Sequence, residues 1–404
     1  MCLERSPEER SQSGQMQPDP DVTLYAAGPV TVPQRVLAAG AMPMIHHRTA
    51  AFHALYGDCA KGMQWLLNTR QDILLTHTSG RGAMEACISN LLSPGDEIIC
   101  VANGKFGNMF AEIATAYGLT AHRIWSDWTR PFEGDEAATA LSTAIAAHPK
   151  VKAVTICHSD TSNSVENDIR LAAEVAHRHG VLVIVDAVSS AGCARIEFDA
   201  WQIDALATAS QKGLMSPAGA AFVVLSDRAW QAAEASRLPK FFVNLLDIRK
   251  EFHKKPDAPE TPGSTPVSLI RSVSEALTMI REEGRDAVFA RHARLSRAVR
   301  QGLTGMGLEL VPGNLKRPSL SVTTFFVPQR TTGPAIRKAL LDSFRIQIAG
   351  GLGEYKDTTL RIGHMGYFHD TDALCVIAAL ETTLHRLGVV PDMSPGIAAC
   401  MRAL

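Results

Sequence analysis

The sequence lacks the features that mark several large classes of protein. Its 40 basic and 41 acidic side chains give a net charge of −1, so no excess of one sign is available to attract nucleic acid or an anionic membrane surface. No apolar run approaches the roughly 18 residues that a membrane-spanning helix needs. We therefore expect small molecules as the partners, and neither nucleic acid nor membrane.

Patterns typical of metal sites and of secretion are also missing. The eight cysteines are scattered without a C-x-x-C pair, and no histidine-rich cluster has metal-binding spacing. We therefore expect reduced core thiols and no metal centre. The first twenty residues are polar and contain no apolar stretch of signal-peptide length. This favours a cytoplasmic protein with an N-terminal arm over residues 1–21.

Short apolar runs alternate with longer helical patterns, which predicts an α/β fold with a mostly parallel sheet. Several of the runs are apolar on both faces, as buried parallel strands are. The candidate strands are 73–77, 97–101, 122–125, 153–158, 182–186, 205–209 and 221–225. The candidate helices between them include 82–92, 110–117, 141–147 and 169–179.

The C-terminal third has a different organisation. Residues 238–266 are rich in Pro, Lys and Asp, and we expect a loop or crossover there. A long helical pattern from 267 to about 303 follows, and then a second, smaller set of alternating elements. With 404 residues available, the sequence predicts a large domain over 22–285 and a small C-terminal domain over 286–404.

Two strand ends carry candidate catalytic side chains. One apolar strand ends at Asp186 and the next runs directly into Lys212, and ligands of such sheets bind beyond these strand ends. A carboxylate there can hold a protonated pyridine nitrogen, and a desolvated lysine can form an imine with an aldehyde cofactor. The alternatives are a helix N-cap for Asp186 and a solvated surface charge for Lys212.

Three further motifs can bind parts of a small ligand. The turn with Ser79, Gly80 and Arg81 lies between a strand and a helix, where backbone N–H groups bind phosphate; it matches no dinucleotide or nucleoside triphosphate motif. Phe106 lies near glycines and can stack on a flat ring, or it can simply pack in the core. Arg361 can pair with a substrate carboxylate or form an interdomain salt bridge.

Taken together and in order, these motifs resemble the class V aminotransferases, in particular the alanine/serine/aspartate–glyoxylate branch and its pyridoxamine–pyruvate relative. The matching stretches are 27–33, 47–48, 79–85, 92–96, 103–107, 185–190, 210–213 and 360–366. The resemblance implies the pyridoxal-phosphate fold of type I, with a seven-stranded sheet in the large domain and a smaller α+β C-terminal domain. It also implies an aminotransferase that uses an amino acid and an oxo acid such as glyoxylate or pyruvate.

The resemblance assigns roles to individual residues. Lys212 is implied as the Schiff-base lysine, Asp186 as the partner of the pyridine nitrogen, and Arg361 with backbone at Gly28 as the substrate-carboxylate site. Further cofactor contacts are implied for Ser79, Gly80, Arg81, Phe106, Ser162, Val188 and Gln211. A homodimer is implied, in which Ser264 and Thr265 of the neighbouring subunit contact the phosphate.

Two departures from the family pattern keep an alternative function open. Where the family usually reads Glu-Thr-Ser-Thr-Gly-Val, this chain has Asp at 160, Asn163 and Ser164. Gly263 stands where relatives place an aromatic residue before the phosphate-binding turn. The alternative is a pyridoxal-phosphate-dependent lyase or carbon–carbon bond-forming enzyme; a catalytically silent binding protein is the other. A cysteine desulfurase is disfavoured, because the glycine-rich loop over 350–356 contains no cysteine.

Overall fold

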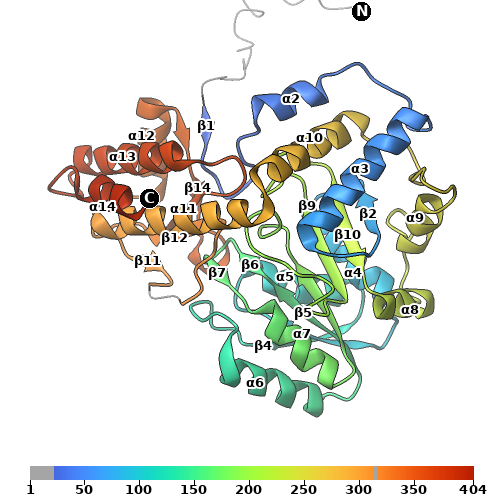
Figure 1. Ribbon diagram of the computed structural model, residues 1–404. Helices are drawn as coiled ribbons and strands as arrows, with labels where there is room; N and C mark the ends of the chain where they lie inside the picture. The colour runs from blue at the N-terminus through green and yellow to red at the C-terminus, as the bar shows by residue number, and fades with distance from the viewer. Residues whose placement is uncertain (1–21, 314–315) are drawn as a thin grey trace, which may run out of the picture.

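The computed structural model describes residues 22–313 and 316–404, so the expected N-terminal arm at 1–21 lies outside the described residues. The chain forms a large body around one sheet and a smaller body built from its C-terminal part (Figure 1). In the part of the chain that is described, no helix is both long enough and apolar enough to cross a membrane.

The large body is organised by a seven-stranded sheet, as expected. Its strand order is β2-β10-β9-β8-β5-β3-β4, and β10 alone runs antiparallel to both of its neighbours. The strands are β2 Ile73–Thr76, β3 Glu97–Val101, β4 Thr120–Ile124, β5 Val151–Cys157, β8 Leu182–Asp186, β9 Ala205–Ala209 and β10 Ala221–Leu225. All seven apolar runs identified in the sequence form strands, with ends shifted by at most two residues.

Alternating side chains bury both faces of this sheet. In β8, Val183 and Val185 belong to one hydrophobic cluster, whereas Leu182 and Ile184 belong to another on the opposite face. The first face is covered by α2 Gln34–Gly40, α3 Ala50–Leu67, α6 Gly134–Ala147, α7 Ile169–Arg178 and α10 Val267–Glu283. The second is covered by α4 Gly80–Leu91, α5 Lys105–Ala116, α8 Asp227–Ala235 and α9 Leu245–Phe252.

Two expectations about the later part of the chain were wrong in detail. The expected loop at 238–266 contains the helix α9, whose N-cap Asn244 accepts the Leu246 N–H at 3.2 Å. Only Leu245 and Ile248 of this helix are buried, so the sequence shows too few regularly spaced apolar residues to predict a helix here. The expected single helical pattern at 267–303 is two helices, because Gly284 has a φ of 92° and ends α10.

In the small body, the helices α11, α12, α13 and α14 pack against an antiparallel sheet of order β11-β12-β15-β14. Its elements are α11 Arg285–Gly305, β11 Leu310–Val311, β12 Val322–Phe326, α12 Gly333–Phe344, β13 Ile346–Gln347, β14 Ala349–Gly350, η1 Gly353–Tyr355, β15 Thr359–Gly363, α13 Asp370–Arg386 and α14 Pro395–Ala403. The first described strand, β1 Thr23–Leu24, pairs with β13. The division at 285/286 coincides with the Gly284 break and stays a prediction.

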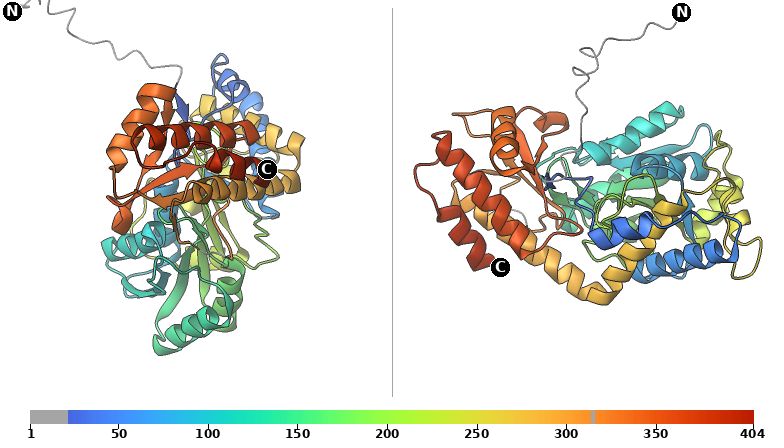
Figure 2. Two further views of the ribbon diagram at one scale, coloured as in Figure 1. Left: turned by 90° about the vertical axis from the view of Figure 1, so that its left-hand side faces the viewer. Right: turned by 90° about the horizontal axis from the view of Figure 1, so that it is seen from above.

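The two bodies lie beside each other, as the view from above shows (Figure 2), and a short hairpin lies where they meet (Figure 1). It consists of β6 Ser159–Asp160 and β7 Val165–Glu166. The Ser159 hydroxyl lies 2.7 Å from that of Ser319, and the Ser164 hydroxyl lies 2.6 Å from that of Thr324. These buried polar contacts fix the small body beside the carboxyl ends of the large sheet's parallel strands.

Candidate active site

A cavity of about 280 Å³ opens at the carboxyl ends of β8 and β9. It lies close to the lower end of the roughly 300–1,000 Å³ typical of small-ligand pockets. Eight of the residues predicted from the sequence line it: Ser79, Gly80, Arg81, Phe106, Asp186, Val188, Gln211 and Lys212. Met84, Met109 and Ser189 complete the lining and were given no role, although Met84 and Ser189 lie within the matching stretches 79–85 and 185–190.

Asp186 is the last residue of β8 and is buried. Its Oδ1 accepts the N–H of Val188 at 2.8 Å, and the thiol of Cys157 donates to Oδ2 at 3.3 Å. Burial raises the pKa of Asp186 to about 6, and these two hydrogen bonds only partly oppose the shift. The carboxylate is therefore short of positive charge, which a protonated ring nitrogen in the cavity would supply.

Lys212 lies just beyond β9 and reaches the same cavity. Loss of water around its amine lowers the pKa of Lys212 to about 8, and the positive charge of Arg361 adds to this effect. The Nζ donates a hydrogen bond to the carbonyl of Ala27. Gly28 is required there, because a Cβ at this residue, whose φ is +95°, would lie 2.5 Å from Lys212 Cδ. A larger fraction of this amine is therefore in the neutral, nucleophilic form than for an exposed lysine.

The other end of the cavity has the chemistry of an anion site. Ser79 is the N-cap of α4, and its side chain makes no capping hydrogen bond. The N–H groups at the start of the helix face this end, where an anion is favoured. Because Gly80 has no side chain, the start of α4 can lie close to Val188; a Cβ at residue 80 would lie 2.5 Å from Val188 Cγ2. These residues fit a phosphate group.

Asp160 holds the aromatic wall of the cavity in place, a role that we did not infer from the sequence. This fully buried carboxylate accepts the N–H groups of Phe106 at 2.8 Å and Gly107 at 3.1 Å at the start of α5. It also accepts the N–H and hydroxyl of Ser162 at 3.0 and 2.6 Å. Its position just past β5 could have suggested a role by the same strand-end argument that identified Asp186.

Ser162 does not line the cavity. Its hydroxyl donates to Asp160 and accepts the N–H of Lys105 at 3.0 Å. The only proton of this hydroxyl is therefore engaged within the protein. The implied contact of Ser162 with the cofactor ring hydroxyl stays a prediction.

Arg361 does not line the cofactor cavity but a hollow of about 960 Å³ in the small body, and its charge acts on Lys212. It lies in the middle of β15 and is 8% exposed. Its guanidinium donates to the carbonyls of Gly350 at 2.7 Å and Thr161 at 3.0 Å, and burial lowers the pKa of Arg361 to about 10. These partners are neutral, and among the described residues Arg361 forms no salt bridge, although the charge of Asp160 acts on it. A carboxylate bound beside Lys212 would therefore be attracted to it.

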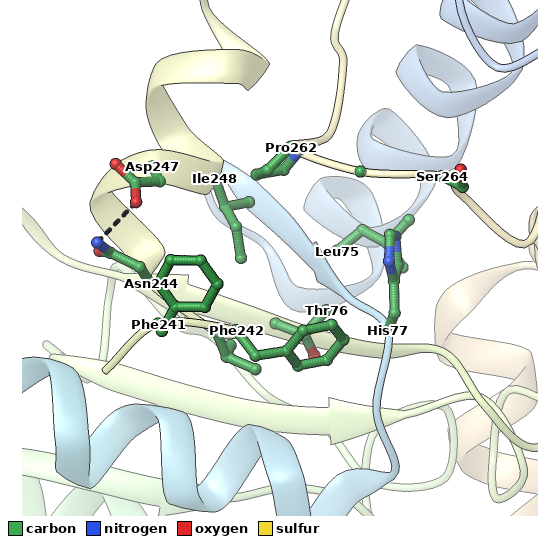
Figure 3. Close-up of a pocket in the computed structure, with 12 residues that line it drawn as sticks. Leu75, Thr76, His77, Phe241, Phe242, Asn244, Asp247, Ile248, Pro262 and Ser264 are labelled. Carbon is green, nitrogen blue, oxygen red and sulfur yellow. Dashed lines mark hydrogen bonds between the residues drawn. The ribbon is translucent and has the colours of Figure 1, made fainter. Parts of the chain in front are cut away.

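Ser264 and Thr265 are not brought to the cofactor cavity of their own chain. Ser264 lines a different cavity of about 510 Å³, while the hydroxyl of Thr265 bonds to that of Thr261. Figure 3 shows the rings of Phe241 and Phe242 on one side of this second cavity and the turn at 262–264 on the other. The two implied phosphate contacts therefore depend on a second copy of the chain.

A protein-family model described as aminotransferase class-V matches residues 24–354. The chain belongs to the class V aminotransferases. It is 37% identical to a protein named soluble hydrogenase, small subunit, from Synechococcus sp. (strain PCC 6716), over 94% of this chain and 98% of that one. It is 32% identical to L-aspartate–glyoxylate aminotransferase of Paracoccus denitrificans, over 93% of this chain and 94% of that one.

A solved structure gives the same result. Pyridoxamine–pyruvate aminotransferase from Mesorhizobium loti matches this class V aminotransferase with a TM-score of 0.86 and 27% identity, over 95% of this chain and 97% of that one. The expectations of the type I fold, of a transaminase and of pyridoxal phosphate as its cofactor are confirmed. The roles of the individual site residues stay predictions.

The departure at Ser164 lies at the junction of the two bodies and outside the cofactor cavity. Ser164 has a φ of 64°, in the left-handed region that favours glycine. The glycine of the family pattern at this position is therefore explained by the positive φ of the backbone. In this aminotransferase the strained serine is compensated by its hydrogen bond to Thr324.

Substitution of Ser164 should reverse the usual stability order of alanine and glycine variants, in which alanine is the more stable. Ser164→Ala keeps the strained backbone and leaves the buried Thr324 hydroxyl unpaired, at a cost of about 1–2 kcal/mol. Ser164→Gly also loses the bond but relieves the strain, and should be the more stable variant by about 1 kcal/mol. Denaturant unfolding of the two variants measures the difference. An alanine variant as stable as the glycine variant would contradict the role of the strain.

The raised pKa of Asp186 makes stability depend on pH in the cofactor-free protein. The folded chain holds this proton up to about pH 6, whereas an ordinary aspartate releases it near 3.8. The folded state thus binds more protons between these values, so stability falls as pH rises through this window and stays lower above it. Asp186→Asn should therefore be more stable than wild type by about 2 kcal/mol at pH 7.

Thermal unfolding of the two cofactor-free proteins at about pH 4 and about pH 7 measures this effect. The advantage of Asp186→Asn should be much smaller at the lower pH, where the carboxyl is protonated in the folded state and only about half ionised in the unfolded state. A constant advantage at both values, or none at pH 7, would show that burial of the charge is not the cause.

Proposed function

We propose that this protein moves an amino group from a small amino acid to an oxo acid such as glyoxylate or pyruvate. One observation carries the proposal: Lys212 and Asp186 line a single cavity that also has an anion-binding helix start. Bound pyridoxal phosphate supplies an electron sink for charge at the substrate Cα. The similarity to L-aspartate–glyoxylate aminotransferase and to pyridoxamine–pyruvate aminotransferase supports these acceptor types.

Lys212 is proposed to hold the cofactor as a Schiff base and then to act as the general acid and base. Once an amino donor is bound, the free Nζ of Lys212 would take the proton from the substrate Cα and hold it for return to the reacting group. A pKa of about 8 suits this role, because an amine that titrates close to neutral pH both accepts and donates protons. Asp186 would keep the ring nitrogen protonated throughout.

The remaining side chains are proposed to fix the two ligands. Ser79, Gly80, Arg81 and Gln211 would bind the phosphate, and Ser162 would lie near the ring hydroxyl. Phe106 and Val188 line opposite parts of the proposed ring site, where a planar group stacks well. The guanidinium of Arg361, together with backbone at Gly28, would orient the substrate carboxylate toward Lys212.

We also propose a homodimer in which each subunit completes the site of the other with Ser264 and Thr265. Phe241 is 96% exposed and Phe242 is 73% exposed, and adjacent exposed aromatic rings are typical of subunit interfaces. Both rings line the same cavity as Ser264, so a partner seated there would lie against the phosphate-binding turn. The seven described cysteines are free, as in proteins from reducing compartments, which supports a cytoplasmic location.

The alternative function, a lyase or a carbon–carbon bond-forming enzyme, receives no support from the departures in sequence. Asn163 is buried and donates to the carbonyls of Asn103 and Trp128 at 2.6 and 2.7 Å. Neither it nor Ser164 lines the cofactor cavity, and Gly263 lines the second one. The changes therefore leave the reacting end of the site unaltered within one chain.

We do not propose a hydrogenase activity for this chain from the name of the Synechococcus relative. An iron–sulfur redox centre is held by several cysteine thiolates. Among the described residues, the one group of histidine, cysteine and acidic side chains close enough to share an ion contains no cysteine. The cavity around Lys212 instead has the residues of amino-group transfer.

A half-reaction tests the proposed function. Holoenzyme mixed with alanine, serine or aspartate alone should convert its cofactor to the amine form, and glyoxylate or pyruvate should reverse the change in visible absorbance. Lys212→Ala should lose turnover by at least about a thousandfold, since it removes both the covalent link and the acid–base group. Its circular dichroism should match wild type. A lyase would return to the starting spectrum without any oxo acid.

A double charge substitution tests the dimer. Phe241→Asp with Phe242→Asp places two carboxylates in the proposed interface and should yield monomers in sedimentation velocity, with weaker cofactor binding because the partner's turn is lost. Met401→Asp changes another side chain that is 62% exposed and should leave the dimer intact. A double variant that stays dimeric would rule out this face as the interface.

A further inference from the structure

Three potential metal ligands that are far apart in the sequence meet at the edge of the large sheet. Glu97 begins β3, His122 lies in the edge strand β4, and His148 is the C-cap of α6. Their ligand atoms all lie within 4.8 Å of one another, and each side chain is partly buried. Figure 1 shows β4 and α6 side by side at the margin of the large body, away from the small one.

Two direct contacts hold the three side chains together. His122 Nε2 lies 2.7 Å from Glu97 Oε2. The rings of His122 and His148 stack with centroids 3.6 Å apart and an interplanar angle of 16°. Because the two rings are nearly parallel, one of them would have to rotate slightly to aim both nitrogen lone pairs at the same ion. Two imidazole nitrogens and one carboxylate oxygen are a known zinc ligand set, with water as the fourth ligand.

The surrounding backbone also favours a cation at this point. The pairing of β3 with β5 shifts register between Glu97 and Ile98, and such irregularities re-aim a side chain out of the regular pleat. The C-terminal end of α6 contributes partial negative charge. Lys150 is the opposing feature, because its positive charge acts on Glu97 and reduces the attraction for an ion.

We propose that Glu97, His122 and His148 form a binding site for a divalent transition metal ion, with Zn²⁺ as the best match to the ligand set. The site lies at the amino end of β3, whereas the cofactor cavity lies at the carboxyl ends of β8 and β9. The ion would link the edge strand β4 to β3 and to the end of α6. Its role is thus structural, and it is independent of amino-group transfer.

Titration of metal-free holoenzyme with Zn²⁺ tests the site. Isothermal calorimetry at about pH 7.5, where free histidine is mainly neutral, should find one strong site per chain, and Zn²⁺ should raise the thermal unfolding midpoint. His122→Ala and His148→Ala should each weaken this binding at least about tenfold and abolish the thermal shift. His179→Ala removes an exposed histidine from the neighbouring helix end and should change neither.

The result that overturns the proposal is Zn²⁺ binding of equal strength in wild type and His148→Ala, or no strong site in wild type. Glu97→Gln provides a second variant that keeps the shape of the side chain and removes its charge; it should weaken binding without unfolding the strand. Transaminase activity serves as a folding control, since no residue of the metal cluster lines the cofactor cavity.

Discussion

The buried carboxylate of Asp160 connects most of the active-site region. It accepts hydrogen bonds from the first turn of α5 and from the Ser162 backbone and hydroxyl. The same short hairpin provides the Thr161 carbonyl to Arg361. A carboxylate without water must be fully hydrogen-bonded, so these partners cannot move independently. The aromatic wall, the hairpin and the substrate arginine are therefore held in one arrangement.

The reactive groups owe their properties to the same loss of water. Burial is the largest cause of the raised pKa of Asp186 and of the lowered pKa of Lys212 and Arg361. Each of these charges is incompletely paired within the chain, which destabilises the folded protein. A ligand that carries a ring cation, a phosphate and a carboxylate would complement all of these features. The unpaired buried charges thus lower the stability of the free protein at the positions where they would bind the ligand.

The sequence predicted the large sheet well because its strands are buried on both faces, and a run such as Val181–Val185 can hardly be anything else. It also predicted eight lining residues of the cavity. Six of them stand at strand ends or helix starts that local pattern reveals, and the family resemblance added Val188 and Gln211. The sequence did not predict α9, since its two buried residues are too few to show helical periodicity. It gave no role to Asp160, whose partners Phe106 and Gly107 lie 54 and 53 residues away.

The sequence by itself determined the α/β fold, the family and the placement of Asp186 and Lys212, because each follows from hydrophobic pattern and motif order along the chain. Only the tertiary structure decided that the Ser162 hydroxyl is engaged by Asp160 and that Ser264 faces a different cavity. It alone brought Glu97, His122 and His148 together. Hydrogen bonds and ion sites depend on distances of a few ångströms between segments, and those distances are set by packing that no local pattern encodes.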